Sequence, residues 1–191
     1  NIHFLSLLIY LKCFPELLGG FADANGDPAH PNDMFNTFFD EHEYFKHIEF
    51  GWISSSENRF NDNIHLTFWQ VDEREKSQVP DGWGVAVSYS QLFDKRWLPF
   101  FRAAYSDGGG GSFLERSVST GVGYYPGGGN DVLGVGLNWG RPSEKTYGAR
   151  LDDQYTAELY YRFQLFPHVS ITPDIQYLVN PAQNPNEDSI W

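Results

Sequence analysis

The amino-acid sequence predicts an all-β protein whose antiparallel strands form part of a transmembrane β-barrel, and three observations lead to that prediction. Polar and apolar residues alternate strictly over residues 154–165 and 170–179, which places side chains of one parity on one face of a strand. Segments with a similar alternation recur along the chain, each with about the ten residues that a tilted strand needs to cross a bilayer. Short and long connections alternate between these segments, as they do between the two rims of bacterial outer-membrane barrels.

The two most regular segments are predicted to pair as a hairpin. A turn centred on His168 would bring the polar side chains of the two strands face to face: Arg162 opposite Asp174, Tyr160 opposite Gln176, and Gln164 opposite Thr172. The hairpin then has one polar and one apolar face.

Seven further strands are predicted ahead of the hairpin, which gives about nine strands in all. They span residues 16–23, 47–55, 63–72, 83–93, 98–106, 115–125 and 131–140. No helical periodicity competes with the period of two. Residues 25–45 are rich in Pro, Asn and Asp and are expected to form a long loop. Residues 1–14 alternate poorly and form an unassigned N-terminal segment, so the predicted sheet covers residues 15–191.

Composition excludes several classes of protein. The net charge of -12 argues against a nucleic-acid partner, because phosphate binding requires clustered Lys and Arg. The single cysteine, Cys13, excludes a disulfide framework. No apolar run approaches the roughly 20 residues of a transmembrane helix. The chain has neither an initiating Met nor a convincing signal peptide, so we expect it to be a fragment that lacks its N-terminus.

A soluble β-sandwich shows the same alternation, with its apolar residues turned inward. Three features favour a barrel with a polar lumen and a lipid-facing apolar surface. The polar parity of the middle strands carries mostly Gly, Ser and Ala, which suit a crowded interior wall. Loop lengths alternate, which a sandwich does not require. Aromatic residues lie near strand ends on the apolar parity, as an interfacial girdle requires: Phe50, Trp52, Tyr105, Tyr124, Trp139, Tyr155 and Phe163.

Three stretches of the sequence resemble one known family. The run AELYYRFQLFPHVSITPDIQYLVNPAQNP at residues 157–185 resembles the C-terminal region of the carbohydrate-selective outer-membrane porins of the OprB type, most specifically in ITPDIQY. The runs FADANGDP at residues 21–28 and GVGLNWGRPS at residues 134–143 resemble further segments of that family, in the same order.

This resemblance implies both an architecture and a function. Family members resemble a barrel of about sixteen strands, so the chain would supply a little over half of it, without the closing strand. The resemblance implies passive, selective diffusion of mono- and oligosaccharides across the outer membrane of a Gram-negative bacterium, with outer-membrane lipid as the surroundings. It leaves the oligomeric state open between monomer and trimer. Because an open sheet cannot persist in lipid, the chain alone is not expected to form a working pore.

Motifs for catalysis and for cofactors are scarce in the sequence. The glycine run 108–111 is followed by no Lys and so is not a phosphate loop. The histidines show no metal-ligand spacing, and no Ser, His and Asp suggest a nucleophile. We therefore expect no enzyme, no metal and no cofactor. The remaining alternative is a β-protein that transports nothing, either a structural or adhesion barrel or a soluble β-sandwich.

A sugar pore requires hydrogen-bonding groups for hydroxyls, aromatic rings for the apolar faces of pyranoses, and weak multiple sites so that the solute can leave. Two groups of polar-face residues fit this description: Glu158, Tyr160, Arg162, Asp174 and Gln176 in the hairpin, and Glu49, His65, Trp69 and Arg102 before it.

Each group has a structural alternative. Arg162 and Asp174 could form a cross-strand ion pair that shapes the wall without touching the solute. Trp69 could pack under an inward-folded loop, and Glu49 could simply be solvated. The charged run 73–76 is expected to be a solvated loop tip.

Overall fold

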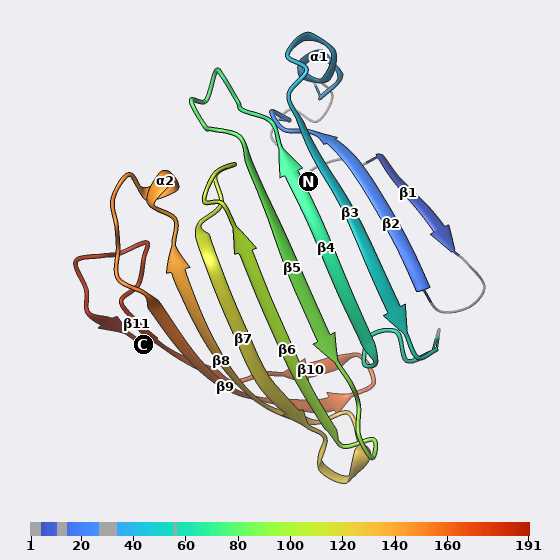
Figure 1. The fold of residues 1–191 in the computed structure, drawn as a ribbon. Coiled ribbons are helices and arrows are strands. Elements are labelled where there is room, and N and C mark those ends of the chain that lie inside the picture. Colours follow the sequence, from blue (N-terminus) through green and yellow to red (C-terminus); the bar gives the residue numbers. More distant parts are fainter. Residues whose placement is uncertain (1–4, 11–14, 27–33, 56) are drawn as a thin grey trace.

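The computed structural model describes residues 5–10, 15–26, 34–55 and 57–191, and in them the chain forms one antiparallel sheet (Figure 1). The sheet has twelve strands, and their order in space follows their order in the chain from β1 to β9, then β11 and β12, with β10 paired to β9. The strands are β1 (Leu5–Tyr10), β2 (Pro15–Asp23), β3 (Tyr44–Ile53), β4 (Asn63–Val71), β5 (Gly82–Ser90), β6 (Trp97–Ser106), β7 (Leu114–Tyr124), β8 (Val132–Pro142), β9 (Gln154–Phe166), β10 (Val169–Ile171), β11 (Asp174–Val179) and β12 (Ser189–Ile190).

The predicted all-β antiparallel fold is confirmed, and each strand expected from the sequence is present. Differences occur at the margins. Strand β1 falls within the segment that the sequence left unassigned, and β12 pairs with β11 where only a loop was expected. The predicted loop at 25–45 ends earlier than expected, because β3 begins at Tyr44.

Two short helices, α1 (Met34–Asp40) and α2 (Glu144–Tyr147), interrupt connections that were expected to be irregular. Helix α2 has clear local causes. The Ser143 side chain accepts a hydrogen bond from the backbone N–H of Thr146 at its start, and Gly148 ends it with a left-handed φ of 69°. Helices of seven and four residues fall below the length at which periodicity indicates a helix.

The register of the C-terminal hairpin differs from the prediction by two residues. Asp174 lies opposite Tyr160, Gln176 opposite Glu158, and Ser170 opposite Gln164. The turn is tighter than expected, since Val169 already pairs with Phe166, and an irregularity follows between Val169 and Ser170. Pro167 favours this tight turn because its ring fixes φ. A shift of two residues leaves every side chain on its predicted face.

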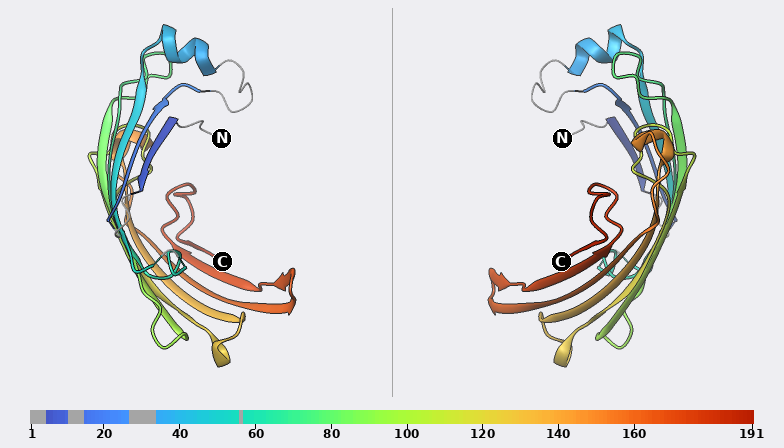
Figure 2. Two further views of the ribbon diagram at one scale, coloured as in Figure 1. Left: turned by 90° about the vertical axis from the view of Figure 1, so that its right-hand side faces the viewer. Right: turned by 90° about the vertical axis from the view of Figure 1, so that its left-hand side faces the viewer.

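The sheet bends into an open trough (Figure 2). Its two faces differ in exposure, as β4 illustrates: Ile64, Leu66 and Phe68 are 43%, 38% and 44% exposed, whereas the alternating polar-face residues between them are only half-exposed. Side chains converge on the inner face of a curved sheet and diverge on the outer face, so the polar face is the concave one and the apolar face the convex one.

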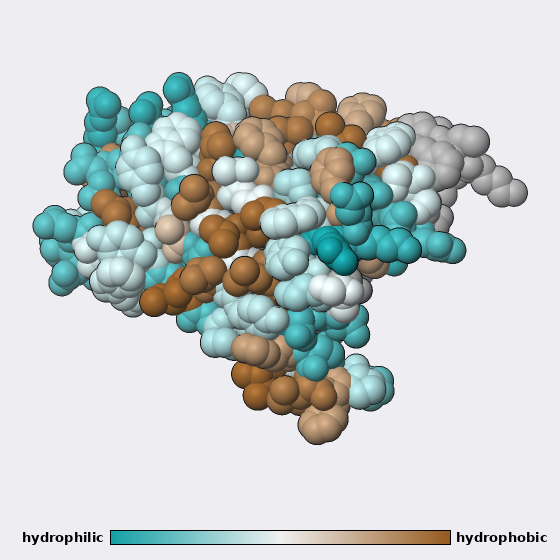
Figure 3. Space-filling view, turned by 90° about the horizontal axis from the view of Figure 1, so that it is seen from below, coloured by the Kyte–Doolittle hydropathy of each residue, from teal (hydrophilic) through white to brown (hydrophobic). Residues whose placement is uncertain are grey.

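Little of the apolar surface is buried within the described residues. The buried hydrophobic residues there are Ala22, Ile53, Val71, Val132 and Ala182. Large hydrophobic side chains instead lie exposed on most strands, and seen from below they form several surface patches (Figure 3). A sandwich would cover them with a second sheet, but the described strands form only one. Leaving each large side chain in water costs about 1.5–3 kcal/mol relative to burial, so the convex face requires an apolar environment.

The connections lie on two rims. One rim carries the described parts of the loops, at 24–26, 34–43, 72–81, 107–113 and 143–153, with both helices. The other rim carries the turns at 54–55, 57–62, 91–96, 125–131 and 167–168 (Figure 1). The long-and-short pattern holds in general but is not strict, since the turn at 54–62 is longer than the loop at 107–113. None of the helices among the described residues is both long and apolar enough to span a membrane.

Candidate functional site

The candidate residues occupy three places along the concave face. Glu49, His65 and Trp69 lie on β3 and β4, and Arg102 lies apart from them on β6. The hairpin group lies across the trough on β9 and β11: Glu158, Tyr160, Arg162, Asp174 and Gln176. The structure therefore brings the candidates together in two clusters that face a common hollow, with Arg102 between them in the order of strands.

Glu49 is held by two neighbours on β4. The Nδ1 atom of His65 lies 2.9 Å from Glu49 Oε1, and the Thr67 hydroxyl donates a hydrogen bond to Oε2 at 2.6 Å. The side chains of Glu49 and His65 are each only 25% exposed. His65 lies across Gly51 of β3, where a Cβ would come within 2.9 Å of Nδ1. The alternative that Glu49 is merely solvated is therefore wrong, because both carboxylate oxygens have protein partners.

Trp69 packs between a neighbouring strand and an inward-folded loop. Its indole lies across Gly84 of β5, where a Cβ would come within 2.6 Å of the ring, and 3.5 Å from where a Cβ on Gly110 would lie. The ring of Phe45 stacks beside it, with centroids 6.3 Å apart and an interplanar angle of 23°. The expectation that Trp69 lies under a loop agrees with this geometry.

A cavity of about 500 Å³ opens beside this aromatic pair. Phe45 and Trp69 line it together with Asp23, Arg74 and Ser112. Its lining thus combines two aromatic residues with charged and polar ones. Cavities of this kind, apolar with a few convergent polar groups, are the usual form of small-molecule sites.

Arg74 is a cavity residue that sequence reasoning missed. The run 73–76 is not simply a solvated tip, because backbone hydrogen bonds between Arg74 and Val79 fold the loop back on itself. The Nη2 atom of Arg74 donates to the Gly110 carbonyl at 3.3 Å, and its buried Nε has no hydrogen-bond partner. Lys76 of the same run is exposed, as expected.

Arg102 stands apart from His65 and Trp69. Its neighbours across the sheet are Ser88 and Ser119, and its guanidinium carbon lies 5.6 Å from the Phe100 ring centroid. The side chain is exposed on the concave face, so it is free to meet a solute.

The hairpin cluster has a different arrangement from the one predicted. Arg162 does not pair with Asp174; its Nη2 atom donates instead to the Asn130 carbonyl at 3.2 Å. The predicted cross-strand ion pair is therefore wrong, because the tighter turn places Tyr160 opposite Asp174. Tyr160 lies across Gly134 of β8, where a Cβ would meet its ring. Asp174 and Gln176 are exposed.

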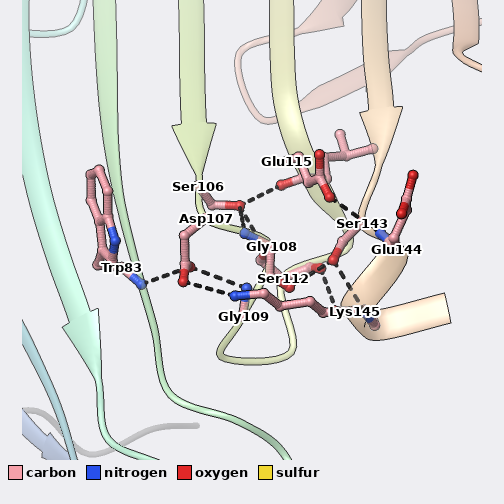
Figure 4. Close-up of polar contacts among 12 residues, drawn as sticks. Trp83, Ser106, Asp107, Gly108, Gly109, Ser112, Glu115, Ser143, Glu144 and Lys145 are labelled. Atoms are coloured by element: carbon pink, nitrogen blue, oxygen red, sulfur yellow. Dashed lines mark hydrogen bonds and ion pairs between the residues drawn. The ribbon is translucent and has the colours of Figure 1, made fainter. Parts of the chain in front are cut away.

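The rim above the concave face is fixed by a network of hydrogen bonds (Figure 4). Asp107 accepts from the backbone N–H groups of Trp83 and Gly109 and forms an ion pair with Lys145 at 3.1 Å. The Ser143 hydroxyl donates to the Gly108 carbonyl at 2.6 Å. These bonds tie the glycine loop 107–113 to β5 and α2, and so hold it against Trp69.

Electrostatics in this network favour ionised Asp107. Burial acts to raise the pKa of Asp107, but the N–H of Trp83, the Lys145 ammonium and the N–H of Gly109 outweigh it and lower the pKa. Among the described residues, no group of three or more His, Cys, Asp or Glu side chains could hold a metal ion.

A comparison with protein families decides the class of the chain. The family described as "Carbohydrate-selective porin, OprB family" matches residues 47–190. The chain belongs to the OprB family of carbohydrate-selective porins. The match covers all of the candidate residues, whereas the FADANGDP stretch at 21–28 lies outside it.

Membership of this porin family implies sugars as the solutes, the outer membrane as the location and β-strands as the membrane-spanning elements. Porins are channels and not a family of enzymes. No curated protein and no solved structure matches the chain.

Proposed function

We propose that the concave face of this sheet lines a channel for the passive, selective diffusion of mono- and oligosaccharides across the outer membrane of a Gram-negative bacterium. The observation that carries the proposal is the division of the two faces: polar residues converge on the hollow side, and large apolar residues remain exposed on the other. A lumen requires water on the first face and lipid on the second.

The concave face supplies the groups that a sugar channel requires. Phe45 and Trp69 offer flat rings to the apolar face of a pyranose, and Arg74 beside them has a buried Nε without a protein partner. Across the trough, Tyr160, Asp174 and Gln176 offer further hydrogen-bonding groups on adjacent strands. Several weak contacts spread along a wall favour transit, because a solute that binds tightly at one site does not leave.

The sheet ends at β1 and β12, and strand edges are not tolerated in lipid. We therefore propose that further strands pair with these edges to complete the barrel, and that the sheet is its C-terminal part, which includes β1 ahead of the expected start at residue 15.

The second candidate is a barrel that anchors its loops and transports nothing. It explains the apolar convex face equally well. It does not explain why Arg74 and the aromatic pair line a cavity on the concave side.

Flux into liposomes tests the proposal. Vesicles that contain the complete barrel are expected to take up radiolabelled glucose and maltose faster than an uncharged polyol of similar size. Trp69→Ala should weaken this preference, and Trp97→Ala is the matched control, since Trp97 is an exposed aromatic on the convex face. If sugar uptake is no faster than in protein-free vesicles, the result would contradict the proposal and support a barrel that transports nothing.

A further inference from the structure

Three basic side chains lie on the convex face at the rim of the long loops, and two of them have carboxylate partners. Lys46 forms an ion pair with Asp72 at 2.9 Å. Arg141 forms one with Asp153 at 3.1 Å. The side chain of Arg116, which lies on the same face of β7, is exposed and forms no ion pair and no hydrogen bond with any described residue. A cation without a partner is costly on a surface that faces lipid.

The cross-strand neighbours of Arg116 make this cost larger. Arg116 lies directly opposite Arg141 of β8 and opposite Tyr105 of β6. Like charges directly opposite each other destabilise a sheet. Asp153 is paired with Arg141, whose hydrogen bonds lower the Asp153 pKa and so favour its carboxylate form. The charges of Glu115 and Glu144 also stabilise the cation of Arg141, but no described carboxylate forms an ion pair with Arg116.

Aromatic rings mark the height of this row in the bilayer. The guanidinium carbon of Arg116 lies 5.9 Å from the Tyr105 ring centroid, and that of Arg141 lies 5.9 Å from the Trp139 ring centroid. Tyr and Trp concentrate where hydrocarbon meets headgroups. The two arginines thus lie at headgroup level, on the side of the long loops.

An apolar groove on the convex face crosses strands β4 to β8 and has Arg116 in its lining. Its volume is about 570 Å³, and its lining includes Leu66, Val85, Val87 and Val118 in addition to Tyr105 and Arg116. The groove therefore places Arg116, which has no ion-pair partner among the described residues, beside aliphatic side chains. An amphiphile with an anionic head and an acyl tail matches both parts.

We propose that Arg116, with Arg141 beside it, binds the phosphate of a lipid headgroup, and that one acyl chain of this lipid lies in the groove beneath. Arginine is suited to this role because its planar guanidinium donates two parallel hydrogen bonds to a phosphate. The proposal rests on the convex face being in contact with lipid, but not on sugar transport.

Native mass spectrometry of the complete barrel in detergent tests the proposal, with three probes. Dioleoyl phosphatidate carries both phosphate and chains, dioleoylglycerol carries only the chains, and inorganic phosphate carries only the anion. The wild-type protein should bind phosphatidate at least about tenfold more tightly than either of the others, a factor that corresponds to about 1.4 kcal/mol.

Arg116→Gln should abolish this preference. Arg102→Gln is the matched control, because Arg102 is also an exposed arginine beside an aromatic ring but lies on the concave face; it should keep the preference. Arg116→Lys keeps the charge and should show an intermediate affinity, which preserves the test if the Gln variant does not fold. Equal loss in the Arg116→Gln and Arg102→Gln variants would overturn the proposal.

The probes also separate the parts of the proposal. Inorganic phosphate that binds as tightly as phosphatidate would contradict a lipid site, and dioleoylglycerol that binds as tightly would contradict a phosphate site. Liposome flux in the Arg116→Gln variant separates this proposal from the transport function: sugar uptake should equal that of the wild-type protein even where phosphatidate binding is lost.

Discussion

Trp69 lies across Gly84 on the neighbouring strand, so closely that a Cβ on residue 84 would come within 2.6 Å of the indole ring. The glycine leaves the space that the indole fills. The glycine loop lies beside another part of the ring, and Trp69 lines the cavity together with Arg74. The position of Trp69, and with it the shape of the proposed sugar contact, therefore depends on a missing side chain in β5.

Gly84→Ala is expected to displace the indole. Overpacking of this kind costs about 1–3 kcal/mol, so thermal unfolding should occur at a lower temperature and Trp fluorescence should shift. Gly136→Ala is the control, because a Cβ on residue 136 would meet its nearest neighbour, in the Phe100 ring, only at 3.9 Å. Equal losses of stability in both variants would show that Trp69 does not occupy the space above Gly84.

Arg74→Gln is expected to reduce the preference for sugars while the barrel remains folded. The substitution removes the positive charge and the buried Nε that has no partner in the cavity. Arg150→Gln is a matched control, since Arg150 is 82% exposed on a loop of the same rim. Uptake of labelled maltose into liposomes is the measurement. Equal uptake by the Arg74 and Arg150 variants would show that Arg74 stabilises its loop and does not contact the sugar.

Asp107 should make the stability of the barrel depend on pH. The pKa of Asp107 is lower in the folded protein than in the unfolded chain. The ionised carboxylate therefore makes its full contribution to the free energy of unfolding above the unfolded pKa of about 3.9. That contribution is lost as the pH falls through the folded pKa. Asp107→Asn should therefore unfold at a lower temperature than the wild-type protein at pH 7, and the difference should shrink in acid. Asp152→Asn, at an exposed loop position, is the control. A difference that is constant with pH would mean that the charge of Asp107 does not stabilise the rim.

The side chains of two adjacent residues in β4 should face different surroundings, one lipid and the other water. Leu66 and Thr67 are neighbours in sequence but belong to the convex and the concave face respectively. After Cys13→Ser, a spin label on Leu66→Cys should be relaxed more by oxygen, which dissolves in lipid, and a label on Thr67→Cys more by a water-soluble nickel complex. The reverse result would show that the concave face meets lipid and the convex face meets water.

Much of this fold follows from the period of two. The alternation along β4 and β9 predicts both the strands and the faces of their side chains, because burial on one face of a sheet fixes the parity of every residue. The pairing of Arg162 was not predictable in the same way. A shift of two residues keeps the parity, so the pattern does not distinguish Asp174 from Thr172 as a partner, and the irregularity after Val169 decides it.

The sequence pattern does not predict the cavity or the arginine row, for different reasons. Arg74 enters the cavity because its loop folds back onto Val79, a contact within a charged run that resembles a solvated tip. Arg116 belongs to the apolar parity of its strand, and only the register with Arg141 shows that two cations face each other. The role of Arg74 depends on its pairing with Val79, and that of Arg116 on its position opposite Arg141. The local sequence pattern shows neither pairing.

The measurement that most directly tests the central claim is ion conductance through the complete barrel in a planar bilayer, recorded while maltose is added. A concave face that lines a sugar channel predicts stepwise conductance that falls as maltose occupies the lumen, with a weaker fall in Trp69→Ala than in Trp97→Ala. Conductance that is absent, or that maltose leaves unchanged in the wild-type protein, would contradict it.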